Sequence, residues 1–166
     1  RSEKGSAYGI SVSGSAEYCR NTGNIHGAVS ASGIIGEMSA SFCYNLGTVT
    51  ANNSKQAYGI GGRYVENCFT YNPNNHVALA PLKIGRNETT AKNSYYLANS
   101  KDELLSAGEY ATLADFASGK VAWGVDGGEG AHANYWTQDT ARGQNQMPAV
   151  PGRAYPKPIE DPNTEF

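Results

Sequence analysis

The sequence predicts an all-β fold: a right-handed parallel β-helix (solenoid) of about four coils, with a small α/β C-terminal cap. Two motifs predict it, because both recur at a nearly constant interval of roughly 25 residues. Composition is the third observation, since the repeats are rich in Gly, Ser, Thr and Asn and poor in leucine. This composition disfavours helical pairs and leucine-rich repeats of similar length. The right hand follows the usual preference of parallel crossover connections.

The first motif is centred on a cysteine. YCRNTG returns as CYNLG and, in a weaker form, as CFTYN. Their cysteines are Cys19, Cys43 and Cys68, and Ser94 takes the equivalent place one interval later. Equivalent residues of successive coils in a parallel β-solenoid stack about 4.8 Å apart. These four small side chains are therefore expected to form one ladder that points inward.

The second motif is AYGI, then ASGI, then AYGI again, and each copy has isoleucine after its glycine. It keeps the period of the first motif, so both belong to one repeat. A second inward ladder is therefore predicted, made of Ile10, Ile34 and Ile60.

The residues that follow each cysteine predict a turn. Asn21 and Asn45 come two places after their cysteines, where a side-chain amide can bond turn backbone or its copy in the next coil. Gly23 and Gly47 are expected to form a corner that needs positive φ. Asn72 takes that place in the third coil, and asparagine tolerates positive φ best after glycine.

The cysteines are expected to be reduced and buried. Three are too few and too evenly spaced for a disulfide framework, and an odd count leaves one thiol unpaired. Parallel, in-register side chains also disfavour the disulfide torsion. Zinc sites need closely paired ligands, whereas His26, His76 and His132 share no such spacing. No catalytic residue, metal site or cofactor is predicted.

Length and charge limit the classes of partner. The chain has 166 residues, of which 17% are charged, and a formal net charge of -2. Nucleic-acid-binding proteins usually carry a basic surface, so no nucleic-acid partner is predicted. The sequence has no long apolar run, so no membrane contact is predicted either. Because the repeats are already under way at Ala7, we expect the chain to be a piece of a longer protein. We also expect it to be a monomer.

The character of the chain changes near residue 100. Residues 1–100 are predicted to hold the repeats. Residues 101–152 are predicted to cap the solenoid, whose open end would otherwise expose unpaired strand edges, and to include a last strand at Met147–Val150. Residues 153–166 hold three of the seven prolines and are predicted to be a semi-rigid linker.

Two helices are predicted in the cap. Ser100 is placed to cap a short one at Lys101–Leu105. Thr112 is placed to cap a second from Leu113 to Trp123. The apolar face of the second helix is Leu113, Phe116, Ala117 and Val121.

Alternation predicts an outward row beside the cysteine ladder, because the residue after an inward-pointing one faces outward. That row is Arg20, Tyr44, Phe69 and Tyr95. A cation followed by three aromatic rings is a candidate platform for the sugar rings of host or bacterial glycans, or for the side chains of a protein partner. In the alternative interpretation the rings pack under a loop or against the cap. Tyr18 and Phe42 make a weaker row of the same kind.

The coils YCRNTGNIHGAVSASGIIG and FCYNLGTVTANNSKQAYGIGG resemble the GLUG-type repeats of large bacterial surface proteins. Those proteins include adhesins and the non-catalytic parts of some immunoglobulin A peptidases. The family pattern is an N-C-Y-N-x-G turn followed by a G-G-I-x-G strand. The ending, with NSYYL, FASGKVAWGVDGG, WTQD and MPAV, is also similar, so the resemblance covers most of residues 7–152. Two departures are Thr70, which replaces the motif asparagine, and the fourth coil at 76–91.

The resemblance implies an extracellular or cell-surface location and a role as stalk, spacer or adhesive module. The peptidase activity does not carry over, because the chain has no H-E-x-x-H, and it has no G-x-S-x-G or phosphate-binding loop. The chain is therefore not expected to be an enzyme.

The alternative function is a carbohydrate-binding or polysaccharide-degrading β-helix, which for catalysis would need clustered carboxylates. Glu17 and Glu66 are two coils, or about 9.6 Å, apart along the axis. This lies at or beyond the range of roughly 6.5–9.5 Å that an inverting pair uses. Ser41 lies between them and Lys92 beyond, so both are expected to be solvated surface charges.

Overall fold

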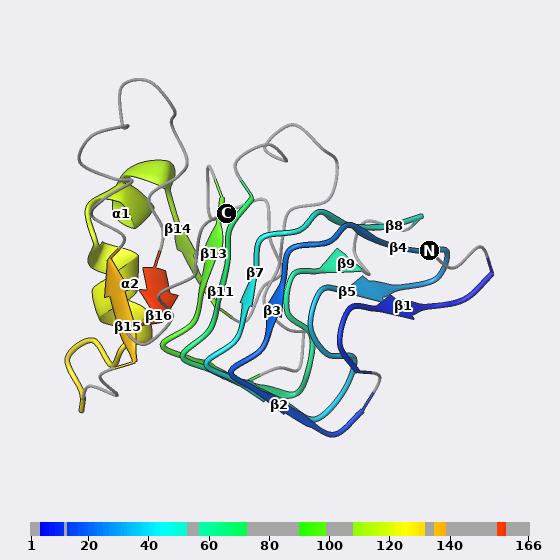
Figure 1. Cartoon of the computed structure of the whole chain (residues 1–166), viewed down its shortest axis with the longest axis horizontal. Helices are drawn as coiled ribbons and strands as arrows, with labels where there is room; N and C mark the ends of the chain where they lie inside the picture. The colour runs from blue at the N-terminus through cyan, green and yellow to red at the C-terminus, as the bar shows by residue number, and fades with distance from the viewer. Residues whose placement is uncertain are drawn as a thin grey trace.

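The computed structural model describes residues 4–11, 13–52, 57–72, 90–98, 108–131, 135–138 and 156–158. Within these residues the chain is mostly β-strand in parallel sheets, with two short helices (Figure 1). The prediction of a β fold with parallel pairing is confirmed.

Four groups of strands pair in parallel. The five-stranded sheet contains β3 (Arg20–Asn21), β7 (Tyr44–Asn45), β11 (Phe69–Thr70), β13 (Tyr95–Leu97) and β14 (Glu109–Ala111). The four-stranded sheet contains β2 (Ser15–Glu17), β6 (Ser39–Ser41), β10 (Tyr64–Glu66) and β12 (Thr90–Lys92). The three-stranded sheet contains β1 (Ala7–Tyr8), β5 (Ala31–Ser32) and β9 (Ala57–Tyr58). The fourth pair is β4 (Ile25–Gly27) with β8 (Val49–Ala51).

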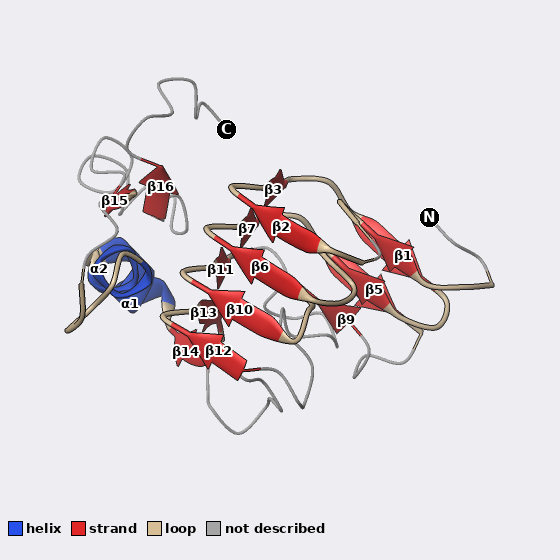
Figure 2. Ribbon diagram, turned by 90° about the horizontal axis from the view of Figure 1, so that it is seen from below, coloured by secondary structure: helices blue, strands red, loops and turns tan. Residues whose placement is uncertain are grey.

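Strand pairing follows the sequence repeat. In the four-stranded sheet Ala16 pairs with Ala40, Ala40 with Val65, and Val65 with Ala91. Figure 2 shows the strands of this sheet side by side in one stack. Each repeat therefore places the same position of its motif beside the equivalent position of the next repeat.

The cysteine column forms as predicted. The backbone N–H of Cys19 donates to Sγ of Cys43 at 3.4 Å, and the N–H of Cys43 donates to Sγ of Cys68 at 3.3 Å. The N–H of Cys68 donates to Oγ of Ser94 at 3.2 Å. Cys43, Cys68 and Ser94 are buried, whereas Cys19 is half-buried because it precedes β3, the edge strand of its sheet. All three cysteines are free thiols.

The isoleucine ladder is only partly as predicted. Ile34 and Ile60 are fully buried, but Ile10 is 47% exposed. Ile10 follows β1, which is the edge strand of the three-stranded sheet and has a neighbour on one side only. Ile35, which the motif did not single out, is fully buried beside the other two.

The prediction of positive φ at Gly23 and Gly47 is wrong. One left-handed corner lies one place before the cysteine or serine of each repeat instead: Tyr18, Phe42, Asn67 and Asn93 have φ of 53°, 50°, 54° and 47°. Gly14, Met38 and Gly62 also have positive φ, of 96°, 72° and 107°. Gly47 has a different reason to be glycine, because a Cβ there would overlap the carbonyl oxygen of Gly23.

The two sequence motifs meet in the interior. A Cβ on Gly33 would overlap the side-chain amide of Asn45, and a Cβ on Gly59 would lie 2.7 Å from the side chain of Thr70. The glycines of the second and third AYGI-type motifs thus leave the space that the side chain two places after the cysteine occupies. As predicted, the asparagines stack, and Nδ2 of Asn21 donates to Oδ1 of Asn45 at 2.7 Å.

The predicted helix from Leu113 to Trp123 is broken in two. The helices are α1 (Leu113–Ala117) and α2 (Lys120–Val125), and Gly119, with φ of 86°, separates them. Thr112 caps α1 as predicted, since its Oγ1 accepts from the N–H of Asp115 at 3.2 Å. The Asp115 carboxylate accepts from the N–H of Thr112 at 2.9 Å in return.

The strands and helices from β14 to β15 (Trp136–Gln138), here called the C-terminal element, cover the outer face of the five-stranded sheet. β14 extends the five-stranded sheet, and then α1, α2 and β15 lie against the outer face of that sheet (Figures 1 and 2). The element was predicted to close an open end of the stack. Its apolar residues pack against the rings of Tyr44 and Phe69 because these rings project from the side of the stack.

Part of the predicted linker belongs to the fold. β16 (Pro156–Pro158) pairs antiparallel with β15. The predicted segments Lys101–Leu105 and Met147–Val150 lie outside the described residues, as do His76, His132 and nearly all of the fourth coil. In the described part of the chain, none of the helices has the length and hydrophobicity needed to cross a membrane.

Candidate functional site

The predicted platform row is formed. Arg20 pairs in register with Tyr44, Tyr44 with Phe69, and Phe69 with Tyr95. Its two central rings are covered, however, since Tyr44 is 3% and Phe69 0% exposed. Arg20 is exposed and Tyr95 is half-buried.

Rings from the C-terminal element form the cover. Trp136 meets Tyr44 edge-on at 5.7 Å between ring centroids and Phe69 at 5.3 Å, and Phe116 meets Phe69 at 6.0 Å. Tyr95 lies so close to α2 that a Cβ on Gly124 would overlap its phenol. Tyr44 and Phe69 are therefore not accessible to a ligand, and packing against the C-terminal element accounts for them.

The cover is anchored by hydrogen bonds that the sequence did not reveal. The carboxylate of Asp126, which is buried at the end of α2, accepts from the backbone N–H of Tyr135 at 2.7 Å and of Trp136 at 2.9 Å. The indole N–H of Trp136 donates to the carbonyl oxygen of Asn67 at 3.0 Å. A carboxylate just after a helix, followed by an aromatic pair, is the only sequence signal for this contact.

Burial raises the pKa of two neighbouring tyrosines, of which Tyr95 packs against the C-terminal element and Tyr96 lies in the core of the stack. It raises the pKa of Tyr95, and the charge of Glu109 raises that pKa further. Burial likewise raises the pKa of Tyr96, with a smaller effect from Tyr110. Both phenols, whose ordinary pKa is 10.0, therefore stay uncharged well beyond neutral pH.

A second group of rings lies at the edge of the cover. Tyr18 and Phe42 stack at 5.2 Å with their planes 10° apart, and Tyr135 meets both rings edge-on at 5.0 Å and 5.2 Å. Tyr18 is 60% exposed, and Phe42 and Tyr135 are half-buried. This ring cluster of Tyr18, Phe42 and Tyr135 is the weaker row of the sequence analysis with one ring added.

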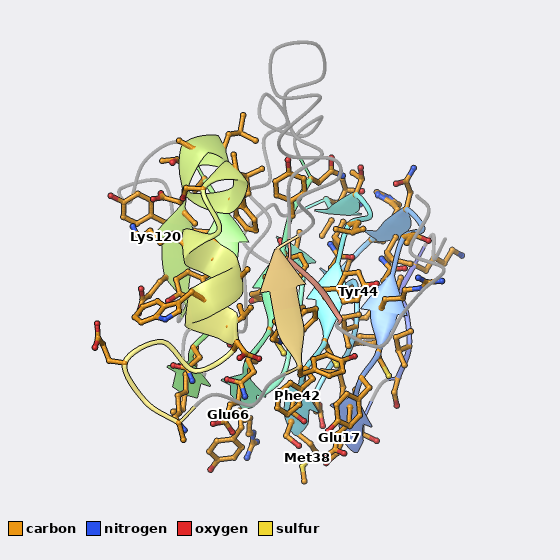
Figure 3. The ribbon with its side chains drawn as sticks, turned by 60° about the vertical axis from the view of Figure 1, so that its left-hand side comes forward. Glu17, Met38, Phe42, Tyr44, Glu66 and Lys120 are labelled. Carbon is orange, nitrogen blue, oxygen red and sulfur yellow. The ribbon has the colours of Figure 1, made fainter. Side chains whose placement is uncertain are left out.

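The carboxylate row lies next to this ring cluster. Glu17 pairs in register with Ser41, Ser41 with Glu66, and Glu66 with Lys92. Nζ of Lys92 lies 2.7 Å from Oε1 of Glu66, and both side chains are largely exposed. Figure 3 shows Glu17, Phe42 and Glu66 along one edge of the molecule.

The thiol column offers little chemistry. Burial raises the pKa of Cys68 well above its ordinary value of 9.0, whereas a hydrogen bond from Cys68 lowers the pKa of Cys43. Burial also raises the pKa of Cys19. Among the described residues, no three His, Cys, Asp or Glu side chains are placed to hold a metal ion.

Together these features define a class of structure: a mostly-β protein of parallel repeats, with an aromatic face packed against its own C-terminal element. No protein-family model, curated protein or solved structure matches the chain.

Proposed function

We propose that the chain is a non-catalytic structural module, a right-handed parallel β-helix that serves as a stalk or adhesive surface of a secreted or surface-anchored bacterial protein. The observation that carries the proposal is the register of the repeats. Each of the first two repeats contributes one strand to each of the parallel sheets, in the same order along the chain. A chain wound as a solenoid has this order.

The contacts between repeats support a load-bearing role. Successive repeats are joined by parallel backbone pairing and by side-chain ladders, such as the 2.8 Å bond between the hydroxyls of Ser15 and Ser39. Each such repeat contacts mainly its neighbours, so length increases by adding repeats without a new core. The covered rings of Tyr44 and Phe69 favour a stalk over a ligand platform on that face.

The resemblance to GLUG-type repeats supports the location outside the cell. An epitope inserted at Gly14 tests it, because this glycine lies in an exposed turn with φ of 96°. In the bacterium that makes the protein, an antibody to the epitope should label intact cells or be recovered from the medium. Labelling that appears only after the cells are lysed would refute the proposal, and an epitope on a cytoplasmic protein serves as the control.

A further inference from the structure

Two kinds of residue occupy the left-handed corner that precedes the cysteine or serine of each repeat. Asn67 and Asn93 hold it in the later coils and bond to each other through their side chains at 3.0 Å. Tyr18 and Phe42 hold the same corner in the first two coils. Asparagine enters this region easily, whereas an aromatic residue is disfavoured there by about 1–2 kcal/mol. The first two repeats thus have aromatic residues at a corner where asparagine, which the later repeats use, would be less strained.

Internal packing does not account for the ring of Tyr18. Phe42 is half-buried between its neighbours, but Tyr18 is 60% exposed although it stacks on Phe42 and touches Tyr135. Backbone strain that packing does not explain is characteristic of functional sites. The edge-on contacts of Tyr135 hold the two stacked rings in one orientation.

A carboxylate and a hydroxyl lie next to these rings in the chain and in the sheet register. Glu17 directly precedes Tyr18 and is exposed, and the hydroxyl-bearing Ser41 pairs with it in register. Lys92 forms its ion pair with Glu66, two strands away from Glu17 in the sheet. Aromatic faces suit the apolar C–H face of a pyranose ring, and carboxylate and hydroxyl oxygens accept bonds from its hydroxyls. An acidic sugar would be repelled by Glu17.

We propose that Tyr18, Phe42 and Tyr135, together with Glu17, form a binding site for a neutral saccharide unit of a glycan chain. The exposed ring of Tyr18 provides the stacking surface, Phe42 and Tyr135 fix its orientation, and Glu17 binds hydroxyl groups. This site is separate from the covered row of Tyr44 and Phe69, and it adds a ligand to the stalk function without depending on it.

Calorimetric titration with cellohexaose, maltohexaose and chitohexaose tests the site, with hexagalacturonate as the acidic counterpart. Tyr18→Asn removes the ring but inserts the residue that the chain itself uses at this corner in Asn67 and Asn93, so folding should be kept. Tyr64→Asn is the matched control, because Tyr64 is 63% exposed and lies on β10, two strands from β2 in the same sheet.

At least one neutral hexasaccharide should bind the parent chain, and hexagalacturonate should bind more weakly. Tyr18→Asn should weaken that binding roughly two- to tenfold, the loss expected for one ring contact, while Tyr64→Asn leaves it unchanged. The site is refuted if none of the neutral hexasaccharides binds, if Tyr18→Asn binds as well as the parent, or if both variants lose affinity equally. Equal or tighter binding of hexagalacturonate refutes the neutral class. None of these outcomes alters the surface labelling that tests the stalk.

Discussion

The buried thiol of Cys68 both accepts and donates a hydrogen bond. Its Sγ accepts the backbone N–H of Cys43 at 3.3 Å and donates to the carbonyl oxygen of Glu66 at 3.1 Å. In the next repeat Oγ of Ser94 makes the same pair of contacts, accepting from the N–H of Cys68 and donating to the carbonyl oxygen of Lys92 at 2.8 Å. The column therefore selects for a small side chain that can accept one hydrogen bond and donate another, and serine and cysteine both meet this requirement.

Replacing Cys68 tests this requirement. Cys68→Ala leaves the buried N–H of Cys43 without its acceptor and should lower the free energy of unfolding by about 1–3 kcal/mol. Cys68→Ser keeps both contacts and should cost clearly less. Urea denaturation of the two variants measures the difference. Equal losses would show that the volume of the sulfur, rather than its hydrogen bonds, stabilises the column.

Thr70 stands where the earlier coils have asparagine, and its hydroxyl is buried with no hydrogen-bond partner among the described residues. Thr70→Val keeps the shape and removes this hydroxyl, so the variant should be more stable by about 1 kcal/mol. Thr48→Val is the control, because Oγ1 of Thr48 accepts from Nδ2 of Asn72 at 3.0 Å and its loss should destabilise. Thermal unfolding of both variants should therefore shift in opposite directions, and a lower melting temperature for Thr70→Val would contradict the argument.

At the scale of elements, the C-terminal element holds to the sheet through a few directed contacts and a shared apolar cluster. Asp126 ties β15 to the end of α2, and Trp136 then reaches across to Asn67. Phe116, Val121 and Val125 of the helices are fully buried in the same cluster as Tyr44 and Phe69. Loss of the Asp126 contact should therefore loosen β15 before it affects the repeats.

Asp126→Ala removes the acceptor of two backbone N–H groups and should destabilise the chain by about 1.5–3 kcal/mol, because both bonds involve a charged partner. In a Trp123→Phe background, Trp136 is the remaining tryptophan, and its fluorescence should shift to longer wavelength as water reaches it. Asp115→Ala is the matched control: it removes the carboxylate that accepts from the N–H of Thr112 in the capping box of α1, and it should cost about 1 kcal/mol without that shift. An unchanged spectrum in Asp126→Ala would mean that packing alone holds β15.

Local sequence patterns predicted much of this arrangement, but not the left-handed corner or the surface that covers the rings. The cysteine spacing predicted the register, and alternation predicted that Tyr44 and Phe69 face away from the cysteine column, because both depend on period and pleat alone. The left-handed corner was assigned to Gly23 by its residue type, but the backbone uses Tyr18, an aromatic residue that local preference argues against. The surface that covers the rings of Tyr44 and Phe69 is held by contacts between distant parts of the chain, such as that of Trp136 with Asn67. No local sequence pattern encodes such contacts.

At the scale of the whole molecule, the described chain has two main apolar clusters with different origins. One lies inside the stack and is built mainly from small and branched residues that each repeat supplies, such as Ala16, Ala40 and Ile60. The other lies between the five-stranded sheet and the C-terminal element and is built mainly from aromatic residues. Because the inner cluster is periodic, we expect it to remain intact when one repeat is deleted. The outer cluster is not periodic and requires Tyr44 and Phe69 under the C-terminal element.

Removing one full repeat tests the solenoid interpretation. Deletion of the repeat that runs from Arg20 to Cys43 joins Cys19 directly to Tyr44, so every ladder should close again in register and the covered row is kept. This variant should fold and unfold cooperatively at a lower denaturant midpoint, because one coil of buried surface is lost. Deletion of only the first half of that repeat, from Arg20 to Ala31, places a strand of the wrong sheet after Cys19 and should abolish the native near-ultraviolet circular dichroism. If both deletions fold equally well, or if neither folds, the repeats are not interchangeable coils and the solenoid interpretation is wrong.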